Sequence, residues 1–216
     1  MQKIILKMFM LNVFLLTGAT AGFAEDKSGK DFSPKMEAMD PSQMSEEQKA
    51  TQVRMQEYST PNEHHDLLKS LAGTWTTNVK FWMDPKGGAM ESEGTSEAKM
   101  IMNGRFLEQT FNGTAMGQPF EGRGLLGYDN LRKEYAGIWF DNMATGIMTS
   151  SGKYDPVTKT IAEEGSMSCP ITNEDHRWYR GVTTFIDADH YTYETYMKDK
   201  DGKEFRSMVI AYTRAQ

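Results

Sequence analysis

Trp139 and Asp141 are the residues of this sequence whose types and spacing best suit chemistry. They lie two residues apart in the segment GIWFDN, so in an extended strand they share one face with Gly137. If that face points inward, an indole and a carboxylate line an interior space. A buried carboxylate without partners has a raised pKa, which suits a general base. The alternative is that Asp141 is a strand-end residue bonded to the turn at Asn142.

Few polar partners are available for an inward Asp141. Arg105, Gln109 and Arg177 are the residues that could meet it inside the fold. The sequence contains no Ser-His-Asp arrangement, phosphate-binding loop or metal-ligand spacing. It therefore permits an isomerase, cyclase or lyase that uses Asp141 and a neighbouring arginine, but no motif requires one.

Residues that bind metals in other proteins are present but poorly spaced. His64 and His65 are adjacent, so on a helix they point about 100° apart and do not form an i, i+4 metal pair. Packing is their favoured role. A haem site would need one of the four histidines as axial ligand, and Cu(I) would need spaced methionines. Four methionines precede the strands: Met36, Met39, Met44 and Met55. The chain has 17 methionines in all, so a bias in composition explains these four as well as copper binding does. We expect no metal and no cofactor.

The first two dozen residues have the pattern of a secretory signal peptide. Lys3 and Lys7 precede the apolar run MFMLNVFLL, and small residues then predict cleavage after Ala21 or Ala24. The run is shorter than the roughly 20 residues that span a bilayer, and an uncleaved anchor is the alternative. Cys169 is the only cysteine, so no internal disulfide can form. The expected location is the periplasm or the cell exterior.

The net charge narrows the choice of partner. The formal charge is −6 for the whole chain, and removal of the two lysines of the leader gives about −8. Nucleic-acid binding needs clustered Lys and Arg, and no basic stripe is present. We therefore expect a small molecule rather than nucleic acid as partner, and no transmembrane segment.

The pattern of residues divides the chain into four parts. They are a signal peptide (1–24), a polar flexible tether (25–44), a helical segment that caps the barrel (45–72) and a β-barrel domain (73–216). Within the third part, SEEQ at Ser45 fits a capping box. Thr60, followed by Pro61 and Glu63, predicts the start of a second helix that ends at Gly73.

After Gly73 the apolar pattern has the period of two that is typical of strands. About ten strands are expected: 75–83, 90–102, 105–112, 117–126, 134–141, 146–154, 159–168, 177–186, 190–198 and 203–214. Turn-forming pairs such as Asn103-Gly104 and Asp129-Asn130 separate them. Short strands in series predict an all-β antiparallel meander, closed into a lipocalin-like or calycin-like barrel that has no free edges.

One hairpin fixes the inner and outer faces. A two-residue turn at Asn103-Gly104 places Lys99 opposite Glu108 outside and Ser96 opposite Phe111 inside. The inner faces of strands 90–102 and 146–154 are rich in small residues, including Ala98, Gly146 and Gly152, and therefore predict a cavity that opens opposite the helix. The residues expected to line it are Ser92, Gly94, Ser96, Gln109, Phe111, Trp139, Asp141, Met148, Ser150 and Tyr179.

Trp75 and Arg214 are expected to form a latch at one barrel end. In an even-stranded meander the end of the last strand lies beside the start of the first, so Arg214 can stack on the Trp75 indole. Gly73-Thr74-Trp75 after a helix, with an arginine in the final strand, is the pattern of lipocalins and related calycins.

A long part of the chain resembles one bacterial family, the domain of unknown function 1579. The resemblance covers nearly all residues from Pro61 to Arg214 and implies a calycin-like barrel, without implying a function or catalytic residues. It lies in PNEHHDLLKSLAGTW (61–75), FWMDP (81–85), GRFLEQTFNGTAMGQPFEGRGLLGYDN (104–130), GIWFDNMATGIM (137–148), GKYD (152–155) and GKEFRSMVIAYTR (202–214).

Three functions are consistent with these residues. The favoured one is a secreted or periplasmic barrel that binds a small apolar or amphipathic ligand. The second is an enzyme of isomerase, cyclase or lyase type that uses Asp141 in the same cavity. The third is a non-catalytic structural or interaction module with a filled core. The size of the cavity separates the third function from the other two.

Overall fold

The structure is a computed structural model that describes residues 44–216. The expected signal peptide, and the tether except its last residue, lie outside the described residues. Within these described residues, two helices precede ten strands. In chain order the elements are α2 (Glu46–Ser59), α3 (Glu63–Ser70), β1 (Gly73–Phe81), β2 (Met90–Ile101), β3 (Phe106–Ala115), β4 (Gln118–Asp129), β5 (Glu134–Asp141), β6 (Met148–Asp155), β7 (Thr160–Cys169), β8 (Glu174–Phe185), β9 (His190–Lys198) and β10 (Glu204–Arg214).

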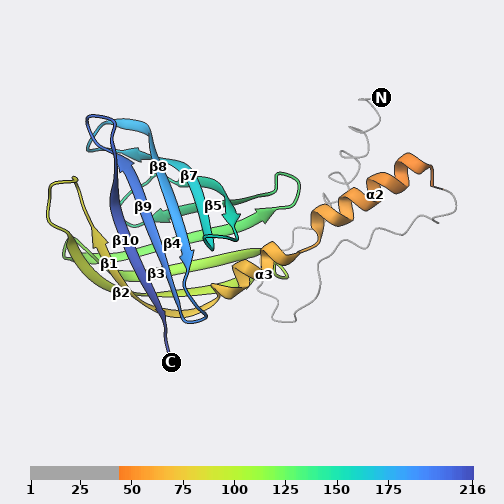
Figure 1. Ribbon diagram of the computed structural model, residues 1–216, viewed down its shortest axis with the longest axis horizontal. Helices are drawn as coiled ribbons and strands as arrows, with labels where there is room; N and C mark the ends of the chain where they lie inside the picture. The colour runs from red at the N-terminus through yellow and green to blue at the C-terminus, as the bar shows by residue number, and fades with distance from the viewer. Residues whose placement is uncertain (1–43) are drawn as a thin grey trace, which may run out of the picture. The chain divides into compact units, whose positions relative to one another are not determined.

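The ten strands form one closed antiparallel barrel, in which each strand pairs with the next and β10 pairs with β1 (Figure 1). The meander expected from the period of two is confirmed, as is the number of strands. Strands β3, β4 and β8 run further than their apolar pattern, because backbone pairing continues through polar residues up to the tight turns. Closure pairs every strand on both sides, which removes the free edges of an open sheet.

The register of β2 and β3 is the one that the sequence predicts. Lys99 lies opposite Glu108, and its Nζ atom is 3.0 Å from the glutamate Oε2 on the outer surface. Ser96 lies opposite Phe111, and both side chains are buried. The even-numbered residues of β2 therefore face the interior.

The turn between these strands differs from the expected two-residue turn at Asn103-Gly104. The ladder ends at Ile101, and the left-handed pair is Met102 (φ 49°) and Asn103 (φ 55°). Gly104 N and Arg105 N both donate to the Ile101 carbonyl, at 3.1 and 3.2 Å. Gly104 adds a third positive φ of 82°, so four residues join the strands while the register stays as expected.

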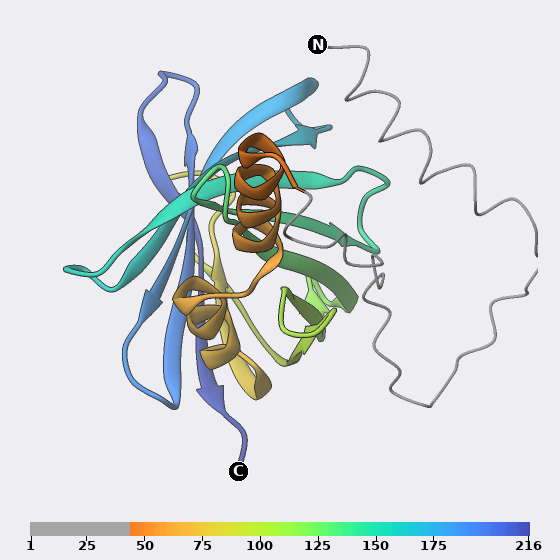
Figure 2. The ribbon, with the colours of Figure 1, turned by 90° about the vertical axis from the view of Figure 1, so that its right-hand side faces the viewer.

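The two helices differ in their relation to the barrel. Helix α3 contacts β2, β3 and β4 (Figure 2). It buries His65 and Leu68. Helix α2 buries no residue, and its large apolar side chains Val53, Met55 and Tyr58 are each more than half exposed. The expectation that the whole segment 45–72 caps the barrel needs correction, because α2 has no apolar face to bury.

Both helices begin at polar caps. The capping box of α2, in which Ser45 and Gln48 bond to each other's backbone, is present as expected. Helix α3 starts later than predicted, because Thr60 Oγ1 donates to the Gln56 carbonyl at 2.6 Å and so belongs to α2. Asn62 caps α3 instead, and its backbone N–H donates to His65 Nδ1 at 3.1 Å.

The C-terminal end of α2 is bonded to two turns of the barrel. Asn130 Nδ2 donates to the carbonyls of Glu57 and Thr60, both at 2.8 Å. Arg105 Nε and Nη2 donate to the Ser59 carbonyl at 3.1 and 2.8 Å. These bonds satisfy carbonyls that a helix end leaves free, and the arginine charge suits the negative end of the helix dipole. Arg105 therefore caps α2. The prediction that it points into the barrel is wrong.

The barrel end beside α3 is densely packed. Trp75 is only 1% exposed and its Nε1 donates to the Leu71 carbonyl at 2.9 Å. The Tyr191 ring meets the Trp75 ring edge-on with centroids 4.7 Å apart. The core at this end consists of Leu68, Leu71, Trp75, Ala98, Leu107, Tyr135, Ile161, Tyr191, Ile210 and Tyr212.

Arg214 closes this end of the barrel from the outside. Its guanidinium carbon lies 4.1 Å from the centroid of the Trp75 ring. The same guanidinium donates to the carbonyls of Ala72 at 3.0 Å and Ala188 at 2.9 Å. Gly73 adopts a φ of +138°, and a Cβ there would overlap the guanidinium. The glycine, the indole and the arginine thus form one contact that joins α3 to both chain-terminal strands of the barrel.

Candidate functional site

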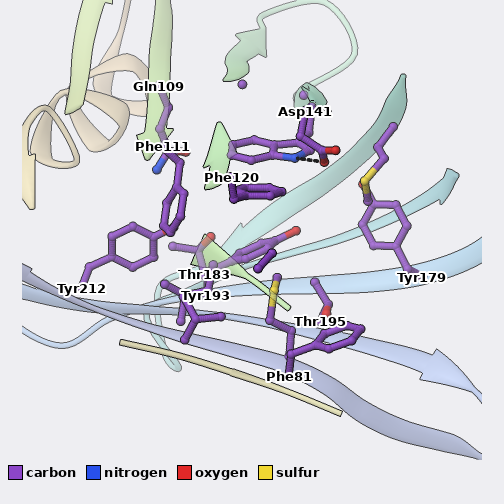
Figure 3. A pocket seen from close by; sticks show the side chains of 18 of the residues that line it. Phe81, Gln109, Phe111, Phe120, Asp141, Tyr179, Thr183, Tyr193, Thr195 and Tyr212 are labelled. Carbon is purple, nitrogen blue, oxygen red and sulfur yellow. Dashed lines mark hydrogen bonds between the residues drawn. The ribbon is translucent and has the colours of Figure 1, made fainter. Parts of the chain in front are cut away.

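A cavity of about 460 Å³ lies inside the barrel and is lined by mostly apolar side chains from all ten strands. Its deep end reaches Leu71, beside the packed core. At its other end the lining residues Met116 and Met143 are 65% and 47% exposed, so the cavity meets solvent there. Figure 3 shows Phe111 on one side of the cavity and Tyr179 on the other. The mouth therefore lies opposite α3.

Methionines are the most frequent side chains near the mouth. Seven line the cavity: Met90, Met116, Met143, Met148, Met167, Met197 and Met208. A methionine side chain is unbranched and polarizable, so it adapts to irregular shapes. The sequence shows the abundance of methionine, but only the closed barrel brings these residues from five strands and two loops to one opening.

Eight of the ten residues expected to line the cavity do so. They are Ser92, Gln109, Phe111, Trp139, Asp141, Met148, Ser150 and Tyr179. The other two, Gly94 and Ser96, face inward but lie behind other side chains. A Cβ on Gly94 would lie 2.8 Å from the Phe111 ring. Ser96 is completely buried, and its Oγ accepts a hydrogen bond from Gln109 Nε2 at 2.8 Å. That the lining residues bind a ligand stays a prediction.

The small residues serve mainly to accommodate aromatic rings. The Trp139 ring occupies the space where Gly122 would carry a Cβ, and the Tyr179 ring does the same at Gly165. Gly146, expected within a strand, lies in the loop before β6. Our inference from small residues to open volume therefore needs correction: rings from neighbouring strands fill much of the space, and the cavity is what remains.

Asp141 lies at the end of β5 and its oxygens already have partners. Trp139 Nε1 donates to Oδ2 at 3.0 Å (Figure 3). Met143 N donates to Oδ1, also at 3.0 Å. This is the strand-end arrangement that was the alternative to a general base. Arg177 bonds to the β7–β8 turn and to the end of β9, and Arg105 caps α2. Both arginines that could have joined Asp141 are engaged elsewhere.

Glu163 of β7 is a second carboxyl in the cavity wall, and sequence reasoning missed it. It lies between Gly152 of β6 and Gly181 of β8. A Cβ on Gly181 would lie 2.7 Å from Glu163 Oε1, so the glycine leaves room for the carboxyl along the wall. Tyr193 Oη donates to Oε1 at 3.0 Å. The available signal was the pair Glu163-Glu164, because one of two adjacent strand residues must face inward.

Burial controls the ionisation of the groups around Glu163. It raises the pKa of Glu163, and hydrogen bonds from Tyr193 and Ser150 offset part of that rise. Burial and the charge of Glu163 raise the pKa of Tyr179 to about 12 and that of Tyr193 well above its ordinary value. Both phenols therefore remain neutral hydrogen-bond donors at physiological pH. Among the described residues, no lysine, arginine or histidine lines the cavity.

The two adjacent histidines have separate packing contacts. The His64 ring stacks on Tyr128 with centroids 3.9 Å apart, and its Nδ1 lies 3.1 Å from Tyr135 Oη. His65 completes the cap of α3. Within residues 44–216, no three His, Cys, Asp or Glu side chains gather as a metal site, and no helix is long and apolar enough to cross a membrane.

The model of one protein family, described as "Protein of unknown function (DUF1579)", matches residues 60–214. The chain belongs to this family. The resemblance that the sequence shows is thereby confirmed, and the DUF1579 match covers α3, all ten strands and the Trp75–Arg214 contact. Comparison of this DUF1579 protein with curated proteins gives no match.

Two solved structures show similar folds. Rv2717c from M. tuberculosis is 16% identical, with a TM-score of 0.54 over 73% of this chain and all of that chain. The S-type phycobiliprotein lyase CPES from Guillardia theta is 9% identical, with a TM-score of 0.50 over 74% of this chain and 96% of that chain. At such identities the likeness is one of fold, and it fits the closed antiparallel barrel of this DUF1579 protein.

Proposed function

We propose that the protein binds a small apolar or amphipathic molecule inside its barrel. The observation that carries the proposal is the cavity of about 460 Å³, which opens at one end and has apolar walls with few polar groups. Ligand sites commonly enclose about 300–1,000 Å³ and combine these two features. The methionines at the mouth support the proposal, because their side chains can adjust as a ligand enters. A cavity of this size weighs against a module with a filled core.

Binding can be tested with N-phenyl-1-naphthylamine, an uncharged dye whose emission rises in apolar surroundings. We expect saturable binding to the full chain, together with a change in Trp139 emission. Ser92→Trp places a large ring on a residue that lines the cavity. This substitution is expected to weaken dye binding by about tenfold or more, because the ring occupies the volume that the dye needs.

Glu93→Trp is the matched control for this experiment. Glu93 is the next residue of β2 and is exposed on the outer surface, so the same ring there leaves the cavity unchanged. Equal dye binding by Ser92→Trp and Glu93→Trp, or no binding by the unmodified chain, would contradict the proposal. Thermal unfolding of each variant verifies that the barrel is intact.

A second candidate function is an enzyme of isomerase, cyclase or lyase type in the same cavity. The observation that favours it is Glu163, a buried carboxyl bonded to Tyr193, rather than Asp141. The lyase from Guillardia theta shares the fold, which is compatible with such a role but supplies no residue. Native mass spectrometry of protein purified from its host would identify the bound molecule. Chemical conversion of that molecule, lost in Glu163→Gln, would then establish the enzyme.

We further propose that the protein acts in the periplasm or outside the cell. The pattern of residues 1–24 supports this location. N-terminal sequencing of the exported protein is expected to give a start at Gly22 or Glu25. A mature protein that begins at Met1 would contradict the proposal.

A further inference from the structure

Three carboxyl groups lie along the cavity wall, and their partners differ. Glu91 is exposed and its Oε1 lies 2.9 Å from Lys80 Nζ. Asp141 accepts from the Trp139 indole and from a backbone N–H of the following turn. Glu163 is the innermost of the three and has only neutral partners. It is therefore the carboxyl that a ligand inside the cavity would meet without competition from a protein cation.

Glu163 retains unused capacity to accept hydrogen bonds. An ionised carboxylate offers about four acceptor positions on its two oxygens. The protein supplies two donors, the hydroxyls of Tyr193 and Ser150. The paired positions on both neighbouring strands are glycines, Gly152 and Gly181, so neither contributes a side chain that competes for the carboxyl. Glu163 lines the cavity, so a ligand there can reach the remaining acceptor positions.

The negative charge of Glu163 disfavours ligands with an anionic head and favours ligands with a cationic head. A carboxylate that enters would be buried near Glu163 without any lysine, arginine or histidine in the lining of the described chain. Burial of an unpaired anion beside a like charge is costly. A cation at the same place would pair with Glu163 and donate to its free acceptor positions, and such charge-assisted hydrogen bonds are the strong ones.

We propose that the cavity selects amphiphiles with a cationic, hydrogen-bond-donating head, such as a primary amine, over amphiphiles with a carboxylate head. This inference rests on the proposed binding function and names the ligand class for it. The head lies at Glu163 on β7. The apolar tail lies between Phe111 and the methionines of the mouth. Phe111 is on β3, which lies across the barrel from β7. Glu163 is then the residue that determines specificity.

The test compares three ligands with one tail and different heads: dodecylamine, dodecanol and dodecanoate. Each displaces N-phenyl-1-naphthylamine from the full chain at neutral pH, below the concentration at which the ligand forms micelles. We expect dodecylamine to bind about tenfold more tightly than dodecanol, and dodecanoate to bind more weakly than both, since one such charged contact corresponds to about a factor of ten. In Glu163→Gln, the preference for the amine over the alcohol should disappear while dodecanol still binds.

Glu164→Gln is the matched control, because it makes the same chemical change one residue away on the exposed face of β7. It should keep the full preference for the amine. Dodecanoate binding as tightly as dodecylamine, or a preference that persists in Glu163→Gln, overturns the inference but leaves cavity binding in place. Failure of the dye and of all three ligands to bind overturns the proposed function itself. Retained dodecanol binding by Glu163→Gln shows that its cavity is folded.

Discussion

At the α3 end of the barrel large aromatic rings fill the interior, whereas at the other end methionines surround an open cavity. The same ten strands build both ends. At the packed end the Trp75 indole N–H has a carbonyl partner and the rings of Tyr191 and Tyr212 stack with centroids 4.1 Å apart. At the open end Met116 and Met143 are exposed. The comparison indicates that one end holds the packed core and the other end leaves an open cavity.

The two ends of the barrel also differ in the segments that lie beside them. The packed end holds α3 and both chain-terminal strand ends, which Arg214 bonds together. Among residues 44–216, the open end has only loops and hairpin turns. Substitutions of the same kind at the two ends should therefore differ in their effects on stability and on binding.

The largest expected difference lies between Trp75→Ala and Trp139→Ala. Trp75 is 1% exposed and surrounded by the core, so its truncation should lower the free energy of unfolding by about 3–5 kcal/mol. Trp139 lines the cavity and is only partly buried, so its truncation should cost less than about half as much. Urea unfolding measures both values. Equal losses would show that the two ends contribute alike.

A smaller difference is expected between two arginines of β10. Arg214→Lys loses the planar group that stacks on Trp75 and bonds to several carbonyls, at a cost of about 1–3 kcal/mol. Arg206 lies on the outside near the open end, with its guanidinium carbon 5.2 Å from the Trp82 ring centroid and Nη1 2.9 Å from Glu194 Oε1. Arg206→Lys should cost less than about 0.5 kcal/mol. Thermal and urea unfolding of both variants provide the comparison, which a large loss in Arg206→Lys would contradict.

The smallest expected effect depends on pH and concerns Glu163→Gln. Burial raises the pKa of Glu163 above its ordinary value of 4.5, so the folded state binds its proton more tightly than the unfolded state. The associated stability is present below pH 4.5 and is lost as the pH rises through the folded-state pKa. Tyr179 and Tyr193, the other titratable groups beside it, stay neutral over this range.

Glu163→Gln should therefore become more stable than the unmodified protein as the pH rises, by on the order of 1 kcal/mol at neutral pH. Thermal unfolding between pH 4.5 and neutrality measures the difference, which should shrink toward the acidic end. Glu164→Gln, on the exposed face, should show no such trend. A Glu163→Gln variant that loses stability relative to the unmodified protein as pH rises would refute the assignment.

The elements that the sequence predicts correctly are those for which a shift of one residue would be costly. A slip in β3 would bury Glu108 and expose Leu107, so the period of two determines which face is inside. The contact of Trp75 with Arg214 follows from antiparallel closure, which places the start of the first strand beside the end of the last. These features depend on pattern and topology, and both are present in the order of residues.

The features that the sequence does not predict are contacts with residues of another strand or helix. Gly94 faces inward as expected, but the Phe111 ring from β3 covers it. Glu163 and Glu164 are chemically identical neighbours, and only the pairing of β7 with β6 and β8 decides which one lines the cavity. Arg105 lies just outside the ladder, so it meets the end of α2 rather than the interior. No local pattern contains these contacts.

The pair of strands that closes the barrel also sets an order of events during folding. Trp75 of β1 pairs with Arg214 of β10, so residues from the two ends of the barrel sequence must meet. Pairings between residues so distant along the chain form slowly. On the ribosome, β1 through β9 can pair in series as they emerge, but the last seam has to wait for β10. Until then the nascent sheet exposes two unpaired edges, and the interval before closure is when the chain is most open to aggregation.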